Sequence, residues 1–197
     1  MRYIIDDKIN GIIRSKLTER RYIHSLGVAE MAENLGKKYG ADPEKLYYAG
    51  FVHDIAKCLS DEEMNRYIRY YGLDLKYMYN PPLAHSKIGA EIVNEVLCVD
   101  DINILNAISY HTTGRAYMSI YEEIMYVADA VEKNRSYNGV RRLRRLARFD
   151  LDETCREILE HCIAGLRHED KMIDSDTLEA LEWIREKINK KRRTYGK

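Results

Sequence analysis

The chain has 197 residues, of which 45% are hydrophobic and 32% are charged, the balance of an ordinary globular protein. Its 32 Lys and Arg residues balance its 32 Asp and Glu residues, so no excess of positive charge indicates a nucleic-acid partner. No apolar run is long enough to cross a membrane, and the first residues lack the apolar stretch of a signal peptide. Four cysteines without a C-x-x-C pair fit a reducing compartment, so we expect a cytoplasmic protein.

Apolar residues recur at helical spacing along the chain, and no alternating strand pattern interrupts them. Capping residues mark several boundaries: Asp42 precedes Pro43, Ser60 stands three residues before Glu63, and Gly40 follows the second helix. The expected helices cover 2–16, 18–39, 43–57, 61–71, 84–97, 101–112, 119–132, 139–148, 152–169 and 176–193, with a loop over 72–82. We therefore expect a single all-α domain, 1–197, of about nine or ten helices, with its core over about 18–185 and a basic tail, 186–197, that frays.

Imidazoles and carboxylates stand on the apolar stripes of five of these helices, at His24, His53-Asp54, His85, His111 and Asp129. Taken singly, a histidine on an apolar stripe is usually a hydrogen-bonded core residue. Taken together, the five positions favour a shared site, because a buried carboxylate without a partner is costly. Imidazole and carboxylate ligands suit iron, manganese, cobalt or zinc, whereas calcium prefers oxygen ligands alone. The sequence therefore predicts a divalent transition-metal site.

Other polar residues are equally well explained by ordinary surface roles. His161 and His168 lack acidic partners of the same kind and are interpreted as ordinary residues. The basic run Arg141–Arg148 is more typical of a solvated helix face than of a site. Lys57 follows His53-Asp54 by one turn, where a phosphate contact and a solvated lysine are equally plausible, and Thr112 is similarly ambiguous.

The spacing of His24, His53-Asp54 and Asp129 resembles the H…HD…D metal signature of the HD-domain phosphohydrolases. Within that family the chain is similar to the YqeK group from about Thr18 to Trp183. The segments that carry this resemblance are YIHSLGVAEMAENLGKKYG, AGFVHDIAK, LAHSKIGAEIV, AISYHTTG, IMYVADAVEKNR, GVRRLRRLA and DSDTLEALEW. The group is similar to symmetrical bis(5′-nucleosyl)-tetraphosphatases, so the resemblance implies cleavage of diadenosine tetraphosphate into two ADP.

The resemblance also implies roles for individual residues. The expected metal ligands are His24, His53, Asp54 and Asp129, with iron as the leading candidate. Of these ligands, His24, Asp54 and Asp129 also face the substrate. Asp54, His85 and His111 are the expected catalytic residues. Further nucleotide contacts are expected from Lys57, His85, His111, Thr112, Arg135 and the segment Ile173, Asp174, Ser175, Asp176 and Thr177.

Several alternatives stay open on the sequence. His85 and His111 either contact the nucleotide, which the resemblance favours, or hold a second metal. The substrate is either a dinucleoside tetraphosphate, another (deoxy)nucleotide or a guanosine alarmone. A non-catalytic nucleotide-sensing module is a third hypothesis, against which the complete set of ligands argues. The oligomeric state is undetermined, with a homodimer as one option.

Overall fold

A computed structural model describes residues 3–195, which form ten α-helices, one short 3-10 helix and no strand. The all-α fold expected from the sequence is confirmed. The elements are α1 (Asp7–Lys16), α2 (Glu19–Tyr39), α3 (Pro43–Val52), α4 (Asp61–Tyr70), η1 (Leu75–Tyr77), α5 (Pro81–Val96), α6 (Ile102–Ser109), α7 (Ile120–Val131), α8 (Val140–Leu146), α9 (Leu151–His168) and α10 (Ser175–Tyr195). Among the described residues, no helix combines the length and apolar character that crossing a bilayer requires.

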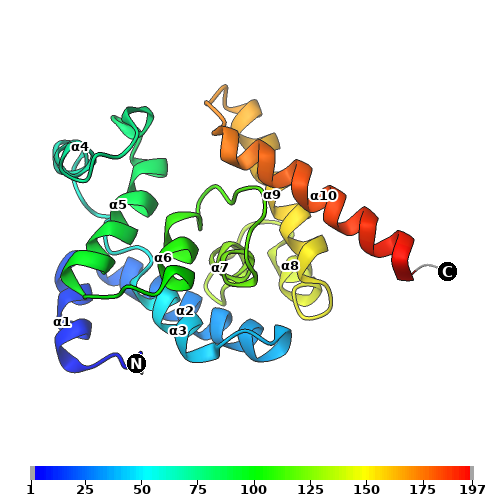
Figure 1. The fold of residues 1–197 in the computed structure, drawn as a ribbon, viewed down its shortest axis with the longest axis horizontal. Coiled ribbons are helices and arrows are strands. Elements are labelled where there is room, and N and C mark those ends of the chain that lie inside the picture. Colours follow the sequence, from blue (N-terminus) through cyan, green and yellow to red (C-terminus); the bar gives the residue numbers. More distant parts are fainter. Residues whose placement is uncertain (1–2, 196–197) are drawn as a thin grey trace.

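The helices form a central group flanked by two arms (Figure 1). In the centre, α2 packs against α3 and α7, and α6 also contacts both α3 and α7. On one side, α4 packs on α5, and α5 packs on α6. On the other side, α9 joins α7 to α8 and α10. Of the six inward residues singled out from the sequence, five come from the central helices and the turns that follow them, and His85 comes from α5.

The closest helix pair, α2 and α3, owes its approach to a glycine. A Cβ atom on Gly50 would lie 2.7 Å from the Cα atom of Ala29, closer than real contacts allow. Glycine is therefore required here, because it lets two backbones meet without a side chain between them. The approach brings the ring of His24 on α2 within 5.4 Å of the ring of His53 after α3.

Two helices end earlier than the sequence predicted, and both corrections affect the site. The helix expected over 43–57 ends at Val52, so His53 and Asp54 lie in tight turns closed by Ile55 N–H to Val52 O and Lys57 N–H to Asp54 O. In the turn both are buried, with 0% and 2% of their surface exposed.

The second early end concerns the helix expected over 101–112. It ends at Ser109, and His111 lies in the turn that follows. Its backbone N–H points to Ile108 O at 3.5 Å, which is a loose 3-10-type closure. The notion that five helices each carry a site residue is therefore corrected: three helices carry them directly, and two carry them on the turn after the last residue.

Other boundaries differ more simply. The loop expected over 72–82 contains η1, and α5 begins at Pro81, because proline suits the first turn of a helix where no N–H is needed. The described part of the basic tail is helical, since α10 continues to Tyr195. The caps at Asp42 and Ser60 and the left-handed Gly40 are confirmed. The division into a core over about 18–185 and a tail stays a prediction.

Candidate metal centre

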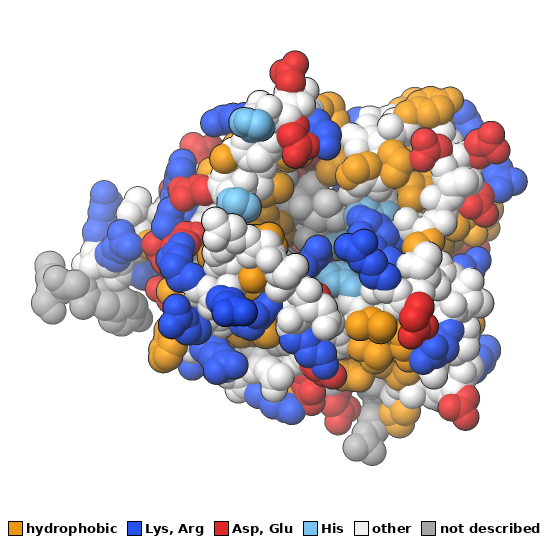
Figure 2. Space-filling view, turned by 180° about the vertical axis from the view of Figure 1, so that it is seen from behind, with side chains coloured by type: hydrophobic (Ala, Val, Ile, Leu, Met, Phe, Trp, Pro, Cys, Tyr) orange, Lys and Arg blue, Asp and Glu red, His pale blue; other side chains and the backbone are white. Residues whose placement is uncertain are grey.

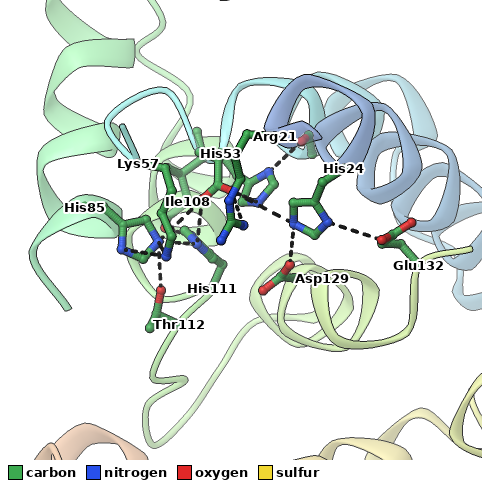
Figure 3. A network of polar contacts seen from close by, with 12 residues as sticks. Arg21, His24, His53, Lys57, His85, Ile108, His111, Thr112, Asp129 and Glu132 are labelled. Carbon is green, nitrogen blue, oxygen red and sulfur yellow. Dashed lines mark hydrogen bonds and ion pairs between the residues drawn. The ribbon is translucent and has the colours of Figure 1, made fainter. Parts of the chain in front are cut away.

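Four buried histidines lie close together, as Figure 3 shows for His24, His53, His85 and His111. Asp54 lies among them. Its carboxylate oxygens are 3.6 Å from His53 Nε2, 3.5 Å from His85 Nε2 and 3.9 Å from His111 Nε2. His24 Nε2 lies 3.9 Å from Asp54 and 2.8 Å from Asp129 Oδ1. The structure thus brings together all six residues that the sequence placed on inward stripes.

Each histidine presents the same nitrogen to this centre. Their Nδ1 atoms face outward: His53 donates to Gly50 O at 2.7 Å, His85 to Pro81 O at 3.1 Å, and His111 to Ile108 O at 2.6 Å. These bonds hold the hydrogen on Nδ1 and leave a lone pair on Nε2. The Nε2 atom of His53 is buried and has no hydrogen-bond partner, whereas that of His24 meets Asp129 Oδ1 at 2.8 Å. A buried nitrogen is rarely left unpaired, so His53 Nε2 marks a place for a ligand.

The fourth histidine is oriented by a residue that the sequence analysis missed. His24 Nδ1 lies 3.2 Å from Oε1 of Glu132, a carboxylate that is 1% exposed. Glu132 also accepts a hydrogen bond from Asn134 N at 2.7 Å. A carboxylate behind a histidine is a common second-shell partner of metal ligands. Its place three residues after Asp129, at the C-terminal end of α7, is the only sequence signal that pointed to it.

The protonation of these groups follows from burial and from their neighbours. Burial, reinforced by the charge of Lys57, lowers the pKa of His85 to about 4, and burial also depresses the pKa of His111. Burial acts to lower the pKa of His24 as well, but the hydrogen bonds to Asp129 and Glu132 outweigh it and raise it to about 9. Although burial acts to raise the pKa of Asp54, the surrounding imidazoles depress it. The carboxylate is therefore ionised at neutral pH.

Two arginines hold the acidic residues of the cluster. Arg21 Nη1 lies 3.0 Å from Asp54 Oδ2, and Arg135 Nη2 lies 2.6 Å from Asp129 Oδ1. Arg135 also donates from Nε to the backbone oxygen of Asp129 at 2.8 Å. Arg135 was expected near the site, whereas Arg21 was missed, because an exposed-looking arginine in a first helical turn carries no signal of its own.

The cluster opens into a pocket of about 320 Å³. One wall is polar and holds most of the expected contacts: Asp54, Lys57, His85, His111, Thr112, Asp129 and Arg135. The opposite wall is less polar and comes from α7, α9 and the segment between α7 and α8: Tyr126, Tyr137, Ile158, His161 and Cys162. The rings of Tyr137 and His161 stack at 5.9 Å with an interplanar angle of 17°. His161, interpreted from the sequence as ordinary, is therefore a pocket residue. In Figure 2 a hollow opens on this face, with Lys and Arg side chains at its edge and histidine visible beside them.

Two of the expected contacts cluster around His85. Lys57 Nζ lies 3.2 Å from His85 Nε2, and Thr112 Oγ1 lies 3.4 Å from the same nitrogen. The segment 173–177 lies elsewhere in the fold. Asp174 pairs with Lys76 at 3.1 Å, and Asp176 pairs with Lys87 at 3.8 Å.

The remaining residues of that segment and the basic run have structural surroundings. Ile173 packs on the core, Ser175 begins α10 and is exposed, and Thr177 is buried. None of the residues from 173 to 177 lines the 320 Å³ pocket. In the basic run, Arg144 donates to the backbone oxygens of Val131, Glu132 and Arg135 at 2.6–3.1 Å, so it supports the end of α7.

The residues of the cluster fit a divalent metal. His24, His53 and Asp129 offer three ligand atoms that all lie within 4.8 Å of one another, and so do His53, Asp54 and His111. His53 has the form of a metal ligand, with an unpaired Nε2 atom and a ring held by the hydrogen bond from Nδ1 to Gly50 O. The His/Asp cluster therefore indicates a divalent metal site.

Comparisons with known proteins agree with this geometry. The model of the family described as HD domain matches residues 21–134. The chain is 36% identical, over 87% of its length and 93% of the relative, to the symmetrical bis(5′-nucleosyl)-tetraphosphatase of Bacillus subtilis. It is 38% identical, over 85% of its length and 90% of the relative, to the protein of the same name from Halalkalibacterium halodurans.

A solved structure supports the same grouping. It is a predicted HD superfamily hydrolase from Clostridium acetobutylicum described as involved in NAD metabolism. It superposes with a TM-score of 0.89 at 36% identity and covers 92% of this chain and 97% of its own. Because the family model spans more than half of the chain, and the relatives match nearly all of it, the chain belongs to the HD-domain family of hydrolases, alongside the symmetrical bis(5′-nucleosyl)-tetraphosphatases.

Proposed function

We propose that the chain is a metal-dependent hydrolase that splits diadenosine tetraphosphate symmetrically into two ADP. The observation that carries the proposal is the cluster of His24, His53, Asp54 and Asp129, two of which line a pocket together with Lys57 and Arg135. The names of the relatives that match most of the chain supply the substrate.

We propose His24, His53, Asp54 and Asp129 as the metal ligands, and iron as the metal. The donor set of imidazoles and carboxylates supports iron but also suits manganese, cobalt or zinc. A divalent metal bound here supplies an activated water and neutralises negative charge on a phosphate. Arg21 pairs with Asp54 and Arg135 with Asp129, so both guanidinium groups lie beside the proposed ligands, where they would also donate to phosphate oxygens of the substrate.

Lys57, His85, His111 and Thr112 then form the phosphate-binding wall. A phosphate beside His85 and His111 favours their protonated forms, since a negative charge raises the pKa of an imidazole. Both Nε2 atoms then become donors to phosphate oxygens or to the departing nucleotide. The ammonium of Lys57 at 3.2 Å from His85 supports this role over a second metal, because two cations repel each other. The stacked pair Tyr137 and His161 offers a flat surface for a nucleobase.

Among the expectations that stay predictions are the cytoplasm as compartment, a homodimer as one option for the open oligomeric state, no nucleic-acid partner, and a substrate role for 173–177. For that segment, the ion pairs of Asp174 and Asp176 with Lys76 and Lys87 place it near basic residues outside the 320 Å³ pocket.

Product analysis tests the reaction. Diadenosine tetraphosphate should give two ADP and neither AMP nor ATP. In oxygen-18 water, one of the two ADP molecules should carry one label at its β-phosphate, because water attacks one of the two central phosphorus atoms. ATP with AMP would contradict the placement of the substrate. Turnover of guanosine alarmones or other (deoxy)nucleotides alone would favour an enzyme with a different nucleotide substrate. Nucleotide binding without any product would favour the non-catalytic sensing module.

The metal site has its own test. Asp54→Asn removes the charge at the centre of the cluster, so we expect metal affinity to fall about a hundredfold or more and turnover to be lost. Glu179→Gln, which removes an exposed carboxylate on α10, is the matched control and should keep both. Elemental analysis of anaerobically purified protein measures the metal. Full metal occupancy in Asp54→Asn would exclude Asp54 as a ligand.

A further inference from the structure

A second pocket of about 420 Å³ lies on the other side of the metal ligands. Its lining comes from the first turns of α2 and from the segment that follows α7: Arg20, Arg21, Ile23, His24, Glu132, Asn134 and Arg135. Arg21 and Arg135 line this pocket and the 320 Å³ pocket alike, so the two arginines form the partition between them. Of the expected site residues, only His24 and Arg135 reach this second pocket.

The partition coincides with the candidate metal centre. Arg21 is bonded to Asp54 at 3.0 Å and Arg135 to Asp129 at 2.6 Å, while His24 lines the second pocket and Asp54 the first. His24 is 8% exposed, and its Nε2 atom lies 2.8 Å from Asp129 Oδ1. The metal ligands are therefore reached from two sides.

Symmetrical cleavage requires such an arrangement. The bond that breaks is the central one of the tetraphosphate, so the middle of the phosphate chain lies at the metal. Two equal nucleotide halves must then leave the centre in different directions. One pocket receives one half, and the other half needs a surface of its own.

The chemistry of the second pocket fits a nucleoside diphosphate. Three guanidinium groups, of Arg20, Arg21 and Arg135, offer donors for phosphate oxygens. Its acidic member, Glu132, is 1% exposed and is engaged by His24 and Asn134, so it presents little charge to a ligand. Ile23, which is 45% exposed, gives an apolar wall for a base or ribose. A nucleotide could place its phosphates against the arginines and cover the exposed isoleucine with its base or ribose.

We propose that this pocket, built from Arg20, Ile23 and Asn134 around the shared arginines, binds the second nucleoside diphosphate half of the substrate. The inference rests on the proposed function, since only a substrate with two nucleotide ends needs two subsites. The stacked Tyr137 and His161 face one half, and Ile23 faces the other.

Counting bound ADP tests the second subsite without turnover. Isothermal titration of the manganese-loaded protein with ADP should give two ADP per chain. Ile23→Asp places a negative charge on the apolar wall, and Arg20→Ala removes one phosphate donor; each should weaken one of the two sites by about tenfold or more. Arg69→Ala, which removes an exposed arginine of α4, is the matched control and should bind two ADP as the wild type does.

Turnover gives a second measurement. Adenosine tetraphosphate has one nucleoside and fills one subsite, so the ratio of kcat/KM for diadenosine tetraphosphate to that for adenosine tetraphosphate should fall about tenfold in Ile23→Asp. Ile23→Ala, a milder change, should lower the ratio less and guards against misfolding of the aspartate variant. One ADP per chain in the wild type, or an unchanged ratio in a folded Ile23→Asp, would overturn the second subsite. Two ADP per chain without hydrolysis of diadenosine tetraphosphate would instead overturn the proposed reaction and keep the subsite.

Discussion

At the scale of single residues, the site is a set of histidines held in one tautomer by the backbone around them. The carbonyl oxygens of Gly50, Pro81 and Ile108 each accept from an Nδ1 atom, which leaves the Nε2 atoms for ligands. Such bonds fix the ring and its tautomer before a ligand arrives. The choice between metal and substrate is thus set by what lies around each Nε2 atom.

His85 and His111 are the pair for which that choice is testable. Their Nε2 atoms are 3.1 Å apart, and Lys57 lies 3.2 Å from the first of them. If both contact substrate, His85→Ala and His111→Ala should keep one metal per chain, while KM rises or kcat falls by about tenfold to a thousandfold. Metal analysis beside steady-state kinetics measures both quantities. A wild type with two tightly bound metals that drops to one in these variants would assign the pair to a second metal.

At the scale of helices, the sequence predicted which elements exist better than how they end. Periodicity and caps located all ten α-helices, and the inward stripes located the six site residues, because both depend on local spacing. The turns at His53-Asp54 and His111 could not be predicted, since a helical pattern does not reveal where a tighter turn takes over. Glu132 was missed because it meets His24 only when the end of α7 packs on α2. Arg21 was missed because its partner Asp54 lies in the turn after α3, which reaches Arg21 only when α3 packs on α2.

Because α2 packs against the end of α7, Gly27 of α2 has no room for a side chain. A Cβ atom on Gly27 would lie 2.3 Å from Oε2 of Glu132, so the carboxylate that orients His24 would have to move. Gly27→Ala should therefore weaken metal binding by about tenfold to a hundredfold, as loss of a second-shell partner does. Glu132→Ala should have the same effect. Metal titration by competition with a chelator measures the affinity.

The matched control is Gly11→Ala on α1, where nothing lies within 4 Å of an added Cβ atom. It should leave metal affinity as it is and raise the free energy of unfolding by about 0.5–1 kcal/mol, because alanine is the better helix former. Metal binding as tight in Gly27→Ala as in the wild type would show that Glu132 does not orient His24 for the metal.

At the scale of the whole molecule, the last helix joins the site to the rest of the core. α9 contributes Ile158, His161 and Cys162 to the pocket wall, and α10 packs on α9. Lys187 of α10 lies 2.6 Å from Glu123 of α7 and 2.7 Å from Asp152 of α9, and Lys191 also pairs with Asp152. These ion pairs join segments far apart in the chain, which is why the sequence suggested a fraying tail where the structure has an anchored helix.

This three-helix junction should make stability depend on pH in a defined window. Burial raises the pKa of Glu123, a fully buried carboxyl, from an ordinary 4.5 to about 7, against the opposing charge of Lys187. Between these values the folded chain keeps a proton that the unfolded chain has lost, so the free energy of unfolding falls as pH rises from 4.5 to 7. The expected loss is at most about 3–4 kcal/mol, since each pKa unit corresponds to about 1.4 kcal/mol.

Glu123→Gln isolates this contribution, because glutamine resembles the protonated acid at every pH. Urea unfolding with a chelator present, at pH 5, 6, 7 and 8, measures the free energy of unfolding without competition from a metal. The wild type should lose stability relative to Glu123→Gln as pH rises through this window, whereas the exposed-site control Glu179→Gln should run parallel to the wild type. A constant difference between wild type and Glu123→Gln from pH 5 to 8 would mean that Lys187 keeps Glu123 ionised throughout. In that case α10 would be held by a charged pair at all these pH values, and its anchorage of the pocket wall would not weaken towards alkaline pH.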